Sequence, residues 1–143
     1  MEQASTVNAF DVTLRGLGAF PTPTRPRVIW AGTAPAPAFV ALGQAIDRAL
    51  AALGLPPETR AFAPHVTLGR VRVPRRDPAL ATALAAAGAR TFGRLTVGRV
   101  SLMRSDLSRR GARYTELRGW PLPPASGPAP SDLVDIDAPE GDL

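Results

Sequence analysis

The sequence predicts an α+β fold in which mostly antiparallel sheets combine with two helices. Alternating apolar and polar residues indicate strands before, between and after two segments with apolar residues three and four positions apart. Glycines and prolines that favour turns separate these segments. The expected order is strand, strand, helix, strand, helix, strand, strand. A chain of 143 residues fits one domain with a single core.

Two strands are expected before the first helix. Phe10, Val12 and Leu14 alternate with polar residues, which is typical of a half-buried strand. This strand runs into Gly16-Leu17-Gly18 and a proline-rich turn. Residues 27–32, RVIWAG, predict a second short strand.

Apolar spacing and end signals predict both helices. The first spans about 37–53 and ends at Gly54, where two following prolines prevent continuation. The second spans 78–87, with Asp77 as its N-cap and a proline at its first position. The apolar stripe of the longer helix consists of Phe39, Leu42, Ile46, Leu50 and Leu53.

The strand between the helices carries His65, and two further strands are expected near 95–103 and 113–119, with Gly111 in the turn between them. The predicted organisation is an irregular N-terminus over 1–8, one domain over 9–122, and a disordered acidic tail rich in proline and alanine over 123–143.

Composition excludes several classes of site. The chain has no cysteine, so disulfides and thiolate metal sites are excluded. It has one histidine, which argues against a zinc site, and we expect neither metal nor cofactor. No apolar run approaches the roughly 18 residues of a membrane span, and no signal-peptide pattern is present. We therefore expect a soluble, cytoplasmic protein without membrane contact.

The charge is strongly asymmetric along the chain. All 17 basic residues are arginine. Residues 119–143 contain five acids and no basic residue, so the first 118 residues hold 17 basic and 7 acidic residues, a net of +10. A basic body suits a polyanionic partner such as RNA. The alternative is that the high arginine count reflects a biased composition and that these arginines form a solvated surface.

His65 lies in the stretch FAPHVTLGR. Side chains two apart on a strand share a face, so His65 and Thr67 are expected to point one way, and Val66 and Leu68 toward the core. The imidazole can transfer a proton near neutral pH, and the hydroxyl can donate to a phosphoryl oxygen. By itself a His-X-Thr motif on a strand more often has a structural role, in which the histidine only forms hydrogen bonds within the fold.

Three separated stretches of the chain together resemble one known family. They are FAPHVTLGR, AFDVTLRGLGAFPTPTRPRVIWAG and VSLMRSDLSRRGARYTELRGWPL. They resemble segments of the RNA 2',3'-cyclic phosphodiesterases, which belong to the two-histidine phosphoesterases, the 2'-5' RNA ligase-like proteins. The resemblance covers about residues 9–122.

The resemblance implies a two-lobed α+β fold with pseudo-two-fold symmetry, of which this chain holds an incomplete version. It implies metal-free opening of RNA 2',3'-cyclic phosphate ends to a 2'-phosphate by two histidines, one a general base and the other a general acid. Carried over, His65 takes one of these roles, Thr67 contacts the phosphate and Arg70 binds the substrate phosphate. Strict alternation places Arg70 on the wrong face, unless the strand bulges near Gly69.

The family's first His-X-Thr motif has no counterpart in this sequence, whose only histidine is His65. Three accounts are open: the sequence is part of a longer enzyme, two chains associate and supply one histidine each, or the protein binds RNA ends without turnover. Under the first two accounts the activity of the isolated chain is impaired.

Overall fold

The computed structural model describes residues 7–125. It confirms an α+β fold of two helices and mostly antiparallel strands, in which three strands rather than two follow the second helix. The elements are β1 (Phe10–Phe20), β2 (Val28–Thr33), α1 (Pro37–Ala52), β3 (His65–Arg70), α2 (Pro78–Ala86), β4 (Thr91–Val97), β5 (Arg99–Ser108) and β6 (Gly111–Pro121).

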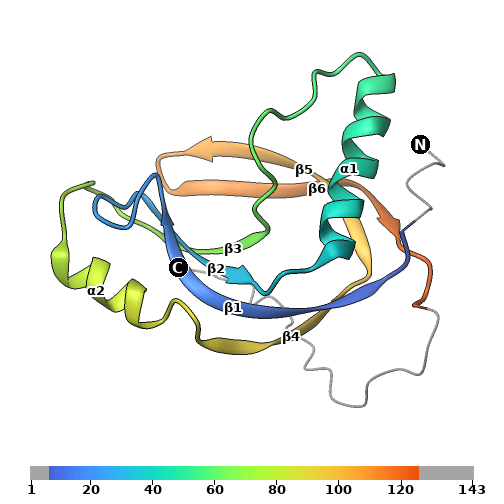
Figure 1. The fold of residues 1–143 in the computed structure, drawn as a ribbon. Coiled ribbons are helices and arrows are strands. Elements are labelled where there is room, and N and C mark those ends of the chain that lie inside the picture. The colour runs from blue at the N-terminus through green and yellow to red at the C-terminus, as the bar shows by residue number, and fades with distance from the viewer. Residues whose placement is uncertain (1–6, 126–143) are drawn as a thin grey trace.

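The strands form two separate antiparallel sheets. The larger has the order β3-β2-β1-β4, so the strand that carries His65 is an edge strand. The smaller is the hairpin β5–β6. Figure 1 shows β1 as a long curved strand, with α1 and α2 lying near opposite ends of it. The edge position leaves one side of β3 without a strand neighbour.

Helix α1 packs against one face of the larger sheet near the N-terminal end of β1 (Figure 1). The Phe39 ring meets the Phe10 ring edge-on at 5.1 Å between centroids. Leu42 and Ala45 of the same helix are buried, as is Val12 of β1. Val12 and Phe10 lie two apart on β1, so they share the face against which α1 packs. Among residues 7–125 the buried hydrophobic residues are Val12, Ala19, Ala31, Leu42, Ala45, Leu84 and Leu122.

The helix ends follow the expected chemistry. Gly54 has φ +83°, and the N–H of Leu55 donates to the carbonyl of Leu50 at 3.1 Å while that of Gly54 donates to Ala51 at 3.0 Å. This pattern is the Schellman motif, which needs a left-handed residue. At α2, Asp77 Oδ1 accepts from the N–H of Leu80 at 3.0 Å, as the N-cap prediction requires.

Two strand predictions were wrong in their limits. Residues 95–103 are not one strand, because β4 ends at Val97 and β5 begins at Arg99. The segment expected to connect the last two strands instead extends β5 to Ser108, and the hairpin turns at Gly111, whose φ is +116°. Most of the predicted N-terminal segment 1–8 and acidic tail 123–143 lies outside the described residues.

Much apolar surface of the described part is open. The hairpin exposes large apolar side chains, and on β3 both Val66 and Leu68 are exposed, at 45% and 58%. Within residues 7–125 no helix is long and apolar enough to cross a membrane. The large apolar side chains that the hairpin exposes are Leu102, Met103, Leu107, Tyr114 and Leu117.

Replacing Asp77 tests the cap of α2. Asp77→Ala removes the acceptor for the Leu80 N–H, so the free energy of unfolding should fall by about 1 kcal/mol in urea denaturation. Asp77→Asn keeps a side-chain oxygen and should retain most of the wild-type stability. Equal stability of all three proteins would show that the cap contributes nothing.

Candidate active site on strand β3

The pairing of β3 with β2 fixes which way each side chain of the His-X-Thr segment points. His65 pairs with Gly32, Val66 with Ala31, and Thr67 with Trp30. Directly paired residues lie on the same face of an antiparallel sheet. His65 and Thr67 therefore share the face of Trp30, as the sequence predicted.

A bulge in β3 brings Arg70 to the same face. Thr67 pairs with Trp30 and Gly69 with the preceding residue of β2, so Leu68 is the extra residue. Arg70 pairs with Val28, which lies two residues from Trp30 and hence on its face. The required irregularity thus exists, one residue before Gly69, and it aligns His65, Thr67 and Arg70.

The expectation that Val66 and Leu68 pack in the core was wrong. Val66 does point away from His65, because its partner Ala31 lies on the opposite face. Yet Val66 is 45% exposed, since β3 is the edge strand. Leu68 is 58% exposed at the bulge. The part of the edge strand that carries His65 is therefore open on both faces.

The hydrogen bond of His65 orients its ring. Its Nδ1 lies 2.7 Å from the carbonyl oxygen of Ala63. A carbonyl oxygen can only accept, so Nδ1 carries the proton and donates. In the neutral ring Nε2 is then the acceptor and is available for proton transfer. His65 is exposed rather than buried, which does not match the alternative of a buried, merely satisfied histidine.

Two aromatic residues, which the sequence did not single out for the site, lie beside the imidazole. The His65 and Phe20 rings are nearly perpendicular with their centroids 5.1 Å apart, and the centroids of the His65 and Trp30 rings are 6.2 Å apart. Gly18 pairs with Trp30, and a Cβ at Gly18 would collide with the indole. The glycine therefore lets the Trp30 ring lie against the sheet. The sequence held one signal for this packing, which is a tryptophan in the predicted strand RVIWAG and glycines in the strand before it.

The face combines a proton-transfer group with anion-binding groups. Thr67 and Arg70 are both exposed. Within residues 7–125 Arg70 forms no ion pair, so its guanidinium can bind an anion through paired N–H groups. The described residues contain no group of three or more His, Cys, Asp or Glu side chains that could hold a metal. The arrangement is suited to a phosphate beside an imidazole.

The family is shown by comparison with known proteins. A family model described as the 2'-5' RNA ligase superfamily matches residues 1–109. The chain belongs to this superfamily. The match includes the first eight residues, which the resemblance noted in the sequence left out. It confirms the family expected from the motifs around His65.

Curated relatives in the superfamily carry one name. The chain is 40% identical over 109 residues to the RNA 2',3'-cyclic phosphodiesterase of Aeropyrum pernix, covering 76% of this chain and 62% of the relative. It is 36% identical over 113 residues to the protein of the same name from Methanothermobacter thermautotrophicus, covering 79% and 61%. The chain thus spans about three fifths of the length of these superfamily members.

Solved structures agree on the fold. The crystal structure of TT0787 of Thermus thermophilus matches with a TM-score of 0.61 and 26% identity, covering 86% of this chain and 66% of that one. The crystal structure of E. coli LigT in apo form matches with a TM-score of 0.55 and 25% identity, covering 85% and 64%. The expected family fold, in incomplete form, is confirmed.

Replacing Gly18 tests the aromatic side of the site. Gly18→Ala places a methyl group against the Trp30 ring, and such overpacking typically costs about 1–3 kcal/mol. We expect lower stability in urea denaturation and shifted NMR signals of the His65 ring protons, because the indole must move.

The matched control is Gly93→Ala on β4, where an added Cβ meets nothing within 4 Å. It should leave the His65 signals in place. If Gly18→Ala is tolerated as well as the control and leaves those signals unshifted, the described packing of Trp30 is incorrect.

Proposed function

We propose that this face binds RNA ends with a 2',3'-cyclic phosphate and opens the ring to a 2'-phosphate by metal-free general acid/base catalysis. The observation that carries the proposal is the alignment of His65, Thr67 and Arg70 on one face by the bulge at Leu68. The names of the curated relatives support the same reaction class.

The reaction needs little besides positioning and proton transfer. The oxygen of a water molecule attacks phosphorus, the bond from phosphorus to the 3'-oxygen breaks, and that oxygen leaves with a proton as the 3'-hydroxyl. His65 Nε2 performs one of the two transfers, taking the proton of water or supplying that of the leaving oxygen. The Thr67 hydroxyl and the Arg70 guanidinium hold the non-bridging oxygens and offset their charge.

One imidazole does not complete both proton transfers in one displacement. The sequence contains a single histidine, so we infer that a second acid/base group comes from outside these 143 residues. A longer polypeptide or a second copy of the chain would supply it. Loss of one positioned acid/base group costs on the order of 10²- to 10⁴-fold in rate, so the isolated chain should be a slow enzyme.

A second candidate function is binding of RNA ends without turnover. It is supported by two observations. His65 is the single histidine of the sequence, and Arg70 makes no ion pair in the described part of the chain and can bind a phosphate. It predicts RNA binding that weakens as salt rises, and no ring opening.

His65→Ala separates the two candidates. A nucleoside 2',3'-cyclic phosphate is incubated with the 143-residue protein, and the 2'-phosphate product is followed by ³¹P NMR. We expect slow opening by the wild type and a further loss of about 10²-fold or more in the variant, because its remaining proton-transfer group is gone.

Circular dichroism provides the control that the variant is folded. Equal rates for wild type and His65→Ala would remove His65 from the reaction. Binding of RNA without any opening by the wild type would favour the non-catalytic candidate.

A further inference from the structure

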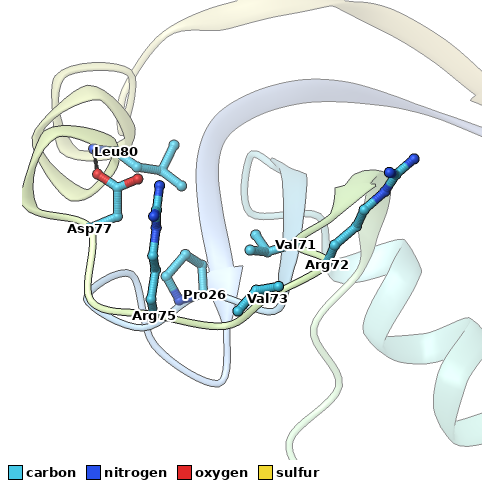
Figure 2. A pocket seen from close by; sticks show the side chains of 7 residues that line it. All are labelled: Pro26, Val71, Arg72, Val73, Arg75, Asp77 and Leu80. Carbon is cyan, nitrogen blue, oxygen red and sulfur yellow. Dashed lines mark hydrogen bonds between the residues drawn. The ribbon is translucent and has the colours of Figure 1, made fainter.

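A cavity of about 360 Å³ lies where β3 ends and the connection to α2 begins, away from His65 at the other end of the strand. Figure 2 shows Arg75 running along it between Pro26 and Asp77, while Arg72 points away from the other lining side chains. Its volume is within the range of small-molecule pockets. The apolar part of its wall consists of Pro26, Val71, Val73 and Leu80.

Two segments far apart in the sequence are joined at the cavity. The N–H of Val71 donates to the carbonyl of Arg27 at 2.8 Å, and that of Asp77 donates to the carbonyl of Thr24 at 3.4 Å. Pro26, between the two acceptors, is less than 2% exposed. These contacts hold the 71–77 segment against the turn between β1 and β2.

The same contacts concentrate positive charge. Residues 70–77 read RVRVPRRD, with four arginines and one acid. That acid, Asp77, is already engaged as the cap of α2. The facing turn adds two arginines, and none of the six forms an ion pair within residues 7–125. The six are Arg25, Arg27, Arg70, Arg72, Arg75 and Arg76.

We propose that this cavity and its arginines bind the RNA strand on the 5' side of the reacting end, with a nucleotide base in the apolar cavity and the flanking phosphates on the guanidinium groups. The proposal rests on the proposed function, because it places the reacting end at His65. Unpaired arginines around an apolar hollow match the two chemical parts of a nucleotide, a charged phosphate and an apolar base face.

The spacing sets the length of RNA that gains from the cavity. His65 pairs with Gly32 and Val71 contacts Arg27, so the cavity begins five partner positions along β2, roughly 17 Å at about 3.3 Å per residue. A stacked strand rises about 3.4 Å per nucleotide, which gives about five nucleotides over this distance. An extended strand needs fewer. Arg70 lies on the His65 face at the end of β3, and Arg72 and Arg75 line the cavity in the segment that follows.

The test compares two substrates that share one reacting end. Ring opening is measured for a dinucleotide and an octanucleotide, each ending in a 2',3'-cyclic phosphate. We expect a higher kcat/KM for the octanucleotide by roughly 5- to 150-fold, the effect of one bound base. Arg72→Ala/Arg75→Ala should bring this ratio toward one. Val73→Asn should do the same without a change of charge, because Val73 lines the cavity and an amide there replaces part of its apolar wall with a polar group.

Arg48→Ala is the control for the loss of one charge and is compared with Arg72→Ala and Arg75→Ala measured singly. It removes one positive charge from α1, which packs on the face opposite His65, and should leave the ratio as in the wild type. An octanucleotide advantage that is absent, or that survives both cavity variants, would overturn the proposal while leaving the ring-opening function intact.

Binding separates this proposal from the proposed function. The Kd of the fluorescein-labelled octanucleotide is measured by anisotropy in the His65→Ala background, so that turnover plays no part. Removing both arginines should reduce the slope of log affinity against log salt by about 1.4, since each single-strand phosphate contact contributes about 0.7. An unchanged slope and Kd would contradict the cavity site, whether or not the wild type opens the ring.

Discussion

The pairing of β3 with β2, including the extra residue at Leu68, is the constraint on which the site depends. A regular strand would put Arg70 on the opposite face from His65 and Thr67, because successive side chains alternate. The bulge resets the alternation after Thr67, so a proton-transfer group, a hydroxyl and a cation share one face. Bulges next to active sites commonly re-aim a side chain in this way. The close approach of Gly18 to the Trp30 ring then leaves an aromatic surface beside the imidazole.

The described residues leave a sheet edge and several apolar side chains open. Strand β3 is an edge strand, and the hairpin β5–β6 exposes side chains such as Leu102 and Leu117. A two-stranded hairpin is marginally stable by itself, and large apolar patches usually mark contacts with other polypeptide. We have proposed that a second acid/base group comes from outside these residues. We propose that the polypeptide that supplies this second group also covers the open strands.

Local signals carried much of the sequence prediction. The stripe from Phe39 to Leu53, Gly54 and Asp77 gave both helices and their ends, because these depend on neighbours within a few residues. The face shared by His65 and Thr67 followed from strand periodicity. The sequence prediction joined β4 and β5 into one strand, because apolar residues alternate with other residues on both sides of Gly98. The sequence suggested a bulge near Gly69, but its position at Leu68 depends on the register with β2. The placement of Phe20 and Trp30 beside His65 likewise depends on the register of strands distant in sequence. The exposure of Val66 depends on what neighbours the edge strand, which periodicity does not report.

The most direct test of the account follows His65 and Arg70 in one titration. A nucleoside 2',3'-cyclic phosphate is added to ¹⁵N-labelled protein, and the ring nitrogens of His65 and the Nε of Arg70 are observed by NMR. If the bulge aligns the two side chains, both signals should shift along one saturation curve, while the Nε of Arg48 stays in place. A shift of His65 without any shift of Arg70 would contradict the alignment of these residues on one face.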